Sequence, residues 1–252
     1  MERRTLPGRL SWQLGEVVAT QAETARARSI TLALPNWMGH RPGQHVDVRL
    51  TAEDGYQAER SYSIASPPEE VPRMTLTVER LDDGEVSPYL TDELRVGDKL
   101  ELRGPIGGYF VWEAHMGGPL LLVAGGSGIV PLMAMLRHQA AVGSMVPTRL
   151  LYSSRSYAEV IYRDELDRLV ESATLLEVAH TLTREQPPGW TGYQRRIDTD
   201  LLREVAWPLD QSPLTFICGP TPFVETAAAS LVALGHKPAR IKTERFGPTG
   251  EA

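Results

Sequence analysis

The residues with the clearest chemical potential lie in a glycine-rich segment near the middle of the chain. Residues 120–124 are all apolar, and Gly125-Gly126-Ser127-Gly128-Ile129-Val130-Pro131 follow directly. This order is typical of a buried strand, a glycine turn and a helix with proline in its first turn. Glycines let the backbone approach a phosphate, and free N–H groups at a helix start donate to it. Gly126, Ser127 and Gly128 therefore predict a phosphate-binding turn, with a plain strand–helix turn as the alternative because Pro131 replaces the third glycine of the dinucleotide fingerprint.

Arginines follow the next predicted strands. A site for NAD usually has an acidic residue at the end of its second strand, but here the sequence reads Ser153-Ser154-Arg155. Arg184 follows the third predicted strand, and Arg196 lies further along. A guanidinium can bind a 2'-phosphate through two parallel hydrogen bonds, so these arginines favour NADPH over NADH. A solvated surface arginine is the alternative for each of them.

The sequence of 252 residues contains one cysteine, Cys218, which comes at the end of a predicted strand and before Gly219 and Pro220. One cysteine cannot form an intramolecular disulfide, a four-cysteine zinc site or an iron–sulfur cluster. No metal site is expected. The cysteine usage indicates a reducing compartment, and the charged N-terminal residues lack the apolar core of a secretory signal, so a cytoplasmic location is expected.

Two segments in the first half of the chain carry complementary polar groups. Arg60-Ser61-Tyr62-Ser63 combines a cation for a phosphate, an aromatic face for stacking and a hydroxyl for a ring nitrogen, although an ordinary β-strand is the alternative. In the second segment, Gly84-Glu85-Val86-Ser87-Pro88, we expect Ser87 to be a helix N-cap and Pro88 the first helical residue. The N–H groups of that helix start would point at a phosphate.

The elements that position these residues change character along the chain. The first half has short alternating apolar and polar runs, which are typical of an antiparallel barrel or sandwich, at 29–34, 45–50, 61–65, 74–80 and 99–103. The second half alternates strands (120–124, 149–152, 175–180, 214–218, 240–244) with helices (131–141, 162–171, 198–205, 222–234). This alternation predicts right-handed βαβ units and a five-stranded parallel sheet. The expected domains are 1–112 and 119–252, with 113–118 as the linker.

Composition excludes several other classes. The chain is 42% hydrophobic and carries a formal net charge of -6, so it has enough apolar surface for two cores and no basic excess for nucleic acid. No formal charge occurs in residues 114–136, but glycines and prolines interrupt this stretch, so no membrane span is expected. The sequence carries no signal for the oligomeric state.

Together these motifs resemble the ferredoxin-NADP reductase family, which includes the reductase components of many oxygenases. Arg60-Ser61-Tyr62-Ser63 matches the flavin motif Arg-x-Tyr-Ser, and residues 84–87 match the second flavin segment. Residues 125–131 match the nicotinamide motif Gly-Gly-Thr-Gly-x-x-Pro with Ser127 in place of threonine. Cys218-Gly219-Pro220 and Glu244-Arg245-Phe246 match two further motifs, although phenylalanine replaces the more frequent tyrosine.

The resemblance implies a Greek-key β-barrel that binds FAD, followed by a Rossmann-like α/β domain that binds NADPH. By this carry-over Arg60 contacts the FAD pyrophosphate, Tyr62 stacks on the flavin and Ser63 approaches flavin N5. Val86 and Ser87 would donate to phosphate oxygens of FAD, and Ser61 and Gly84 belong to the same cofactor site. The nicotinamide site would hold Cys218, with Glu244 nearby and Phe246 over the other flavin face. Gly126, Ser127, Gly128, Gly219 and Pro220 would contact the nucleotide, and Arg155, Arg184 and Arg196 its 2'-phosphate.

The implied activity is hydride transfer from NADPH to FAD and then transfer of single electrons to a separate carrier, ferredoxin or flavodoxin. One alternative is a reductase subunit that serves an oxygenase or a molybdenum enzyme. A more distant alternative is a regulatory nucleotide-binding module without turnover. The role of residues 247–252, which follow the terminal aromatic residue, is left open.

Overall fold

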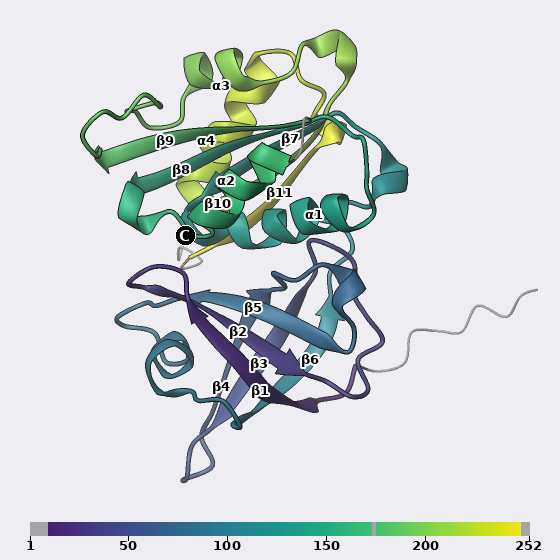
Figure 1. The fold of residues 1–252 in the computed structure, drawn as a ribbon, viewed down its shortest axis with the longest axis vertical. Helices are drawn as coiled ribbons and strands as arrows, with labels where there is room; N and C mark the ends of the chain where they lie inside the picture. The colour runs from purple at the N-terminus through teal and green to yellow at the C-terminus, as the bar shows by residue number, and fades with distance from the viewer. Residues whose placement is uncertain (1–9, 173–174, 248–252) are drawn as a thin grey trace, which may run out of the picture.

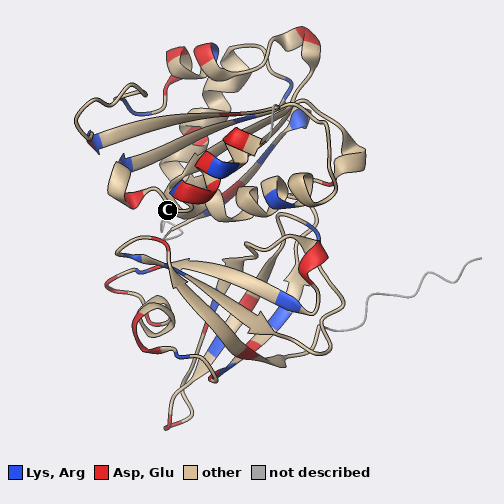
Figure 2. Cartoon of the chain, viewed as in Figure 1, with Lys and Arg blue, Asp and Glu red and all other residues tan. Residues whose placement is uncertain are grey.

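Two β-sheets, one antiparallel and one parallel, organise the part of the chain that this computed structural model describes, residues 10–172 and 175–247. In Figure 1 the antiparallel sheet forms the lower half of the molecule, and the parallel sheet with its helices forms the upper half. Figure 2, in the same view, shows that both halves carry basic and acidic residues. Residues 248–252, most of the segment whose role the sequence leaves open, lie outside the described residues.

The antiparallel sheet has the strand order β4-β3-β6-β1-β2-β5. Its edge strands β4 and β5 approach each other just beyond the end of β4, through an antiparallel bridge between Ile64 and Leu76. This bridge closes the sheet into a barrel whose buried core includes Val46, Val48 and Leu76. The strands are β1 Gln13–Ala22, β2 Ala27–Ala33, β3 His45–Thr51, β4 Gln57–Ser63, β5 Arg73–Glu79 and β6 Lys99–Ile106.

The parallel sheet has the order β11-β10-β7-β8-β9, which confirms the predicted five-stranded Rossmann-like half. Because all five strands run in the same direction, their carboxyl ends meet at one edge, where ligands of such sheets bind. The strands are β7 Leu120–Gly125, β8 Thr148–Ser156, β9 Leu176–Glu185, β10 Leu214–Pro220 and β11 Ile241–Phe246.

Helices cover both faces of the parallel sheet. Side chains of β7 alternate between two cores: Leu122 packs with residues of α1 and α2, whereas Val123 packs with residues of α3 and α4. Asp198 caps α3 by accepting a hydrogen bond from the Leu201 amide at 2.9 Å. The helices are α1 Ile129–Ala141, α2 Arg163–Ser172, α3 Thr199–Val205 and α4 Thr221–Ala233.

The expected N-cap at Ser87 is wrong. The first helical hydrogen bond there runs from the Leu90 amide to the Val86 carbonyl at 3.1 Å, so the turn begins one residue earlier. The Ser87 hydroxyl instead accepts the Leu81 amide at 3.0 Å, because the preceding loop folds back over it. A single π-helical turn, η2 (Tyr89–Glu93), follows.

Polar contacts join the two halves. Arg137 of α1 donates to the Ala65 carbonyl of the barrel at 2.8 Å and makes two hydrogen bonds to Glu165, at 2.8 and 2.6 Å. The hydroxyl of buried Tyr162 donates to Thr77 on β5. These contacts fix the barrel against the α1 and α2 face of the parallel sheet. Within the described residues, no helix is both long and apolar enough to cross a membrane.

Candidate functional site

The glycine turn lies at the carboxyl edge of the parallel sheet, between β7 and α1. Gly126 has a φ of +55°, a conformation that favours glycine, and it lies on the barrel side, where a Cβ would be 3.9 Å from Glu79 Oε2. A Cβ on Gly128 would lie only 2.1 Å from the Cys218 carbonyl oxygen. The turn therefore packs directly on the end of β10, with half-buried Ser127 between the two glycines.

Cys218 and Glu244 are register partners on β10 and β11. Cys218 is 2% exposed, and burial, with a smaller contribution from Glu244, raises the pKa of its thiol well above the usual value. Burial also raises the pKa of the Glu244 carboxyl from 4.5 to about 7. The pair is thus a neutral thiol beside a carboxyl that titrates near neutral pH.

The Glu244 carboxyl also has an unmet hydrogen-bonding requirement. Its Oε2 is buried and has no hydrogen-bond partner in the described part of the chain. Such an atom is costly to leave unpaired, and one at a ligand-binding edge is commonly satisfied by the ligand. A carboxyl with this raised pKa can donate or accept a proton near pH 7.

Gly219, Pro220 and Phe246 complete this edge. Gly219 lies against the Phe223 ring, where a Cβ would be 2.7 Å from the ring. Phe246, the last residue of β11, is the register partner of Pro220 and is 38% exposed. In Figure 1 β11 runs toward the barrel, so its last residue, Phe246, is at the end of the strand that lies closer to the antiparallel sheet.

The predicted flavin residues lie on the edge strand β4. Arg60 and Tyr62 belong to one face of the strand, and Ser61 and Ser63 to the other. Tyr62 packs against the barrel core, and burial raises the pKa of its phenol to about 12, so the ring stays neutral. Ser61 donates to Asp47 Oδ1 at 2.7 Å, which leaves its hydroxyl engaged within the barrel. Ser63 is half-buried opposite His45.

Arg60 already has a carboxylate partner. Its Nη2 donates to Glu85 Oε2 at 2.5 Å, and its Nη1 donates to the Glu59 carbonyl at 2.7 Å. The other carboxylate oxygen of Glu85 accepts the Tyr56 hydroxyl at 2.8 Å. The structure therefore brings the two predicted flavin segments together through Glu85. Sequence reasoning did not select this residue, although it lies between the predicted residues Gly84 and Val86.

The three arginines proposed for the 2'-phosphate are all exposed, and none forms an ion pair with another described residue. Arg155 and Arg184 lie inside the strands β8 and β9, which are longer than predicted, rather than after them. The pairing of the two strands shifts register here: Ser154 pairs with Leu182, whereas Ser156 pairs with Glu185. Arg155 and Arg184 lie between these two pairs, so they are neighbours across the strands at the carboxyl edge. Arg196 lies in the return loop, residues 186–198 between β9 and α3. This loop is attached to β9 by a hydrogen bond from Thr181 Oγ1 to the Arg195 carbonyl.

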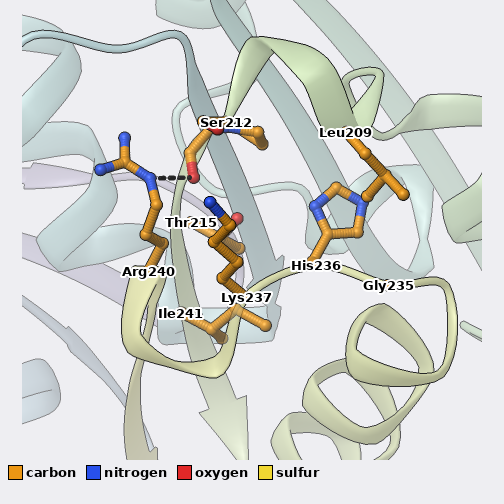
Figure 3. Close-up of a pocket in the computed structure, with 9 residues that line it drawn as sticks. Leu209, Ser212, Thr215, Gly235, His236, Lys237, Arg240 and Ile241 are labelled. Carbon is orange, nitrogen blue, oxygen red and sulfur yellow. Dashed lines mark hydrogen bonds between the residues drawn. The ribbon is translucent and has the colours of Figure 1, made fainter.

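The pocket in Figure 3 lies elsewhere. Its lining includes Ser212, Thr215, Lys237 and Arg240, at the amino-terminal ends of β10 and β11, and Arg240 donates to the Pro213 carbonyl at 3.1 Å. The cavity of about 90 Å³ is too small for a dinucleotide, and it lies at the other edge of the sheet from the glycine turn. No group of three His, Cys, Asp or Glu side chains that could hold a metal occurs in residues 10–172 and 175–247.

These features define a class of protein. An arginine and an aromatic ring on an edge strand of a barrel, together with a glycine turn and a buried acid at the carboxyl edge of a parallel sheet, are typical of a two-domain flavin- and nicotinamide-dependent oxidoreductase. Residues 15–111 match the family model of the oxidoreductase FAD-binding domain, and residues 122–229 match that of the oxidoreductase NAD-binding domain. The chain belongs to the ferredoxin-NADP reductase family.

Individual relatives agree with this membership. The chain is 37% identical over 180 residues to ferredoxin-NADP reductase B of Sorangium cellulosum, covering 70% of this chain and 72% of the relative. It is 30% identical over 211 residues to the glycine betaine monooxygenase reductase subunit of Pseudomonas aeruginosa, covering 83% of this chain and 57% of the relative. The chain thus spans little more than half the length of this second relative.

A solved structure shows the same fold throughout. The FAD/NAD-binding domain of nitric oxide dioxygenase from Vibrio cholerae matches with a TM-score of 0.83 and 27% identity, over 93% of this chain and 98% of that domain. The residues fit the two cofactors of the family. Arg60 offers an exposed guanidinium, and Gly126 leaves open space where a Cβ would lie, with the nearest atom 3.9 Å away. Glu244 presents a buried oxygen that has no hydrogen-bond partner among the described residues. The two halves of the chain are thus an oxidoreductase FAD-binding domain and an oxidoreductase NAD-binding domain.

Proposed function

We propose that the chain is a reductase that takes electrons from NADPH and delivers them one at a time to a separate carrier. The observation that supports this most directly is the pairing of Cys218 with Glu244 beside the glycine turn, at the sheet edge that faces the barrel. When bound, NADPH supplies a hydride and FAD converts this two-electron input into single electrons.

The barrel residues bind and orient the flavin. Arg60 offers the cation for the FAD phosphates, and the backbone amides of Val86 and Ser87 supply further donors. The neutral Tyr62 ring offers an apolar face for stacking, and the Ser63 hydroxyl offers a hydrogen bond to a flavin ring nitrogen. Gly84 permits the tight approach of this loop, since a Cβ there would lie 2.8 Å from Ser87 Oγ.

The residues of the parallel sheet position the nicotinamide. Gly126, Ser127 and Gly128 accommodate the diphosphate, and Gly219 and Pro220 border the nicotinamide end. Cys218 contributes a neutral, buried thiol contact, and the Glu244 carboxyl holds a proton near neutral pH. Phe246 covers the exposed flavin face when no nicotinamide is present, which limits access of water.

NADPH is the proposed donor in preference to NADH. Arg155 and Arg184 lie together at the register shift of β8 and β9, both exposed and without a carboxylate partner among the described residues. Two such guanidinium groups provide the charge and the paired donors that a 2'-phosphate requires. Arg196 in the return loop would approach the same group.

The proposed acceptor is a ferredoxin or flavodoxin. The 252 residues contain only Cys218, too few for an iron–sulfur cluster, so the next carrier lies outside them. A second candidate is a reductase component for an oxygenase, because the relative from Pseudomonas aeruginosa is the reductase subunit of glycine betaine monooxygenase. A molybdenum enzyme as acceptor stays a prediction. The buried free thiol favours a reducing compartment, and we propose the cytoplasm.

The test is anaerobic reduction followed by delivery. The purified protein should be yellow, NADPH should bleach its flavin absorbance in one rapid phase, and the reduced protein should then reduce ferredoxin, flavodoxin or a two-iron oxygenase component. The carrier with the highest kcat/KM identifies the acceptor class. A colourless protein that takes up no added FAD would instead support a module without turnover.

A further inference from the structure

One residue of the flavin site is not explained by binding FAD. Glu85 lies between Gly84 and Val86, in the segment proposed to hold the FAD phosphates, yet its carboxylate carries the same sign of charge as a phosphate. Its Oε2 accepts Arg60 Nη2 at 2.5 Å, although Arg60 is the proposed phosphate cation. The anion-binding group of the barrel is thus satisfied by an anion of the chain itself.

The position of Glu85 is held from a second side. The Tyr56 hydroxyl donates to Glu85 Oε1 at 2.8 Å, so each carboxylate oxygen has its own donor. These two hydrogen bonds lower the pKa of the Glu85 carboxyl, with the Tyr56 bond contributing most, so the group is charged at neutral pH. The pair is also accessible, because the side chains of Arg60 and Glu85 are 51% and 48% exposed. An incoming phosphate can therefore reach Arg60 and displace the carboxylate.

We infer that Glu85 is a surrogate for the FAD phosphate: its carboxylate binds Arg60 in the apoprotein and must be displaced when the cofactor binds. This inference rests on the proposed binding of FAD at Arg60. In this role Glu85 is a positioning residue: its carboxylate holds the Arg60 guanidinium in place, and the competition with the phosphate lowers the affinity for FAD. An exchange of one acceptor for another keeps Arg60 hydrogen-bonded throughout.

The competition predicts a gain of affinity when the charge is removed. Glu85→Gln keeps the size of the side chain and an oxygen that can accept the Tyr56 hydroxyl, but it binds a guanidinium more weakly than a carboxylate does. We expect the apoprotein of this variant to bind FAD about two- to fivefold more tightly than wild type, the range that corresponds to one exposed ion pair. The measurement is titration of apoprotein with FAD, followed by quenching of flavin fluorescence.

Riboflavin separates competition at the phosphate from any general effect on the barrel, because it has the ring system of FAD without a phosphate. Glu85→Gln should leave riboflavin affinity unchanged. Glu59→Gln is the matched control. Glu59 is on β4 next to Arg60, but its carboxylate pairs with Arg49 and Arg103, at 4.0 and 3.6 Å, and not with the Arg60 guanidinium. This control should leave FAD affinity unchanged.

A double-mutant cycle assigns the gain to Arg60. In the Arg60→Ala background, Glu85→Gln should no longer improve FAD binding. FAD affinity of Glu85→Gln equal to or below that of wild type, or an equal gain with riboflavin, would overturn the surrogate role. Failure of the wild-type apoprotein to bind FAD at all would instead refute the proposed function, so the two outcomes are distinct.

Discussion

Cys218 and Glu244 are in register on neighbouring parallel strands, so a buried thiol lies beside a carboxyl whose Oε2 has no partner among the described residues. The two groups share one edge of the sheet with the glycine turn, whose Gly128 lies against the Cys218 carbonyl. The residues proposed for hydride transfer and for nucleotide binding are therefore carried by the ends of the same three strands, β7, β10 and β11.

The raised pKa of Glu244 predicts a specific pH dependence of stability. Because burial raises the pKa of this carboxyl from 4.5 to about 7, the folded chain binds more protons than the unfolded chain between these values. The stabilising contribution is fully present below about pH 4.5 and is lost as pH rises to about 7, with a total of about 3 kcal/mol.

Urea unfolding of the apoprotein across pH 4.5 to 7.5 measures this contribution. Glu244→Gln should remove most of the pH-dependent difference relative to wild type, because glutamine cannot ionise. Identical pH profiles for the two proteins would show that Glu244 ionises normally in the folded chain.

Replacement of Cys218 should affect the reduction of the flavin and leave its binding intact. Cys218→Ala removes the thiol that we propose to contact the nicotinamide, while Arg60 and Tyr62 of the barrel are unchanged. We expect the rate of flavin reduction by NADPH to fall about tenfold or more, as misplacement of reacting groups does. Stopped-flow absorbance gives the rate and fluorescence titration gives the FAD affinity. A reduction rate equal to that of wild type would remove Cys218 from the nicotinamide site.

Replacement of Arg184 should distinguish the two nicotinamide donors. Arg184→Ala removes one of the exposed guanidinium groups at the register shift, so the KM for NADPH should rise about tenfold or more while that for NADH changes little. Steady-state kinetics with both donors give the ratio. Arg203→Ala is a suitable control, since this arginine is paired with Asp200 on α3. An unchanged NADPH to NADH ratio in Arg184→Ala would contradict the assignment.

The glycine turn should tolerate no side chain at Gly128. A Cβ there would lie 2.1 Å from the Cys218 carbonyl oxygen, so Gly128→Ala must push α1 away from β10. We expect a loss of about 2 kcal/mol or more in the free energy of unfolding and a loss of NADPH affinity. Gly108→Ala is the control, because a Cβ at Gly108 meets nothing within 4 Å. Equal stabilities of these two variants would show that the turn can move without cost.

Local sequence patterns were sufficient for the fold and for much of the site. Alternation in the first half and the strand–helix rhythm in the second half predict the two sheets, because side-chain period determines which face of an element is buried. The glycine turn and Cys218 could be located because each directly adjoins an apolar strand. Arg155 and Arg184 were predicted to follow their strands, but pairing between β8 and β9 extends both strands past the apolar core.

Contacts between distant residues could not be predicted in this way. Glu85 meets Arg60 across 25 positions of sequence, and only the closed barrel brings the two together. The Ser87 hydroxyl accepts an amide from the loop before it, so a residue with the right type for an N-cap serves another purpose. Both cases depend on how loops fold against the barrel, which no local pattern records.

The contact between Tyr162 and Thr77 has a consequence for how the two halves of the molecule unfold. Tyr162 is buried with its hydroxyl bonded to Thr77, and the Arg137 guanidinium lies 4.7 Å over its ring while also holding Glu165 and the Ala65 carbonyl. Separation of the two halves would break the hydrogen bonds of Tyr162 to Thr77 and of Arg137 to the Ala65 carbonyl, and would leave these polar groups without their partners. The barrel and the nucleotide-binding half should consequently melt as one cooperative unit, with coincident fluorescence and circular dichroism transitions.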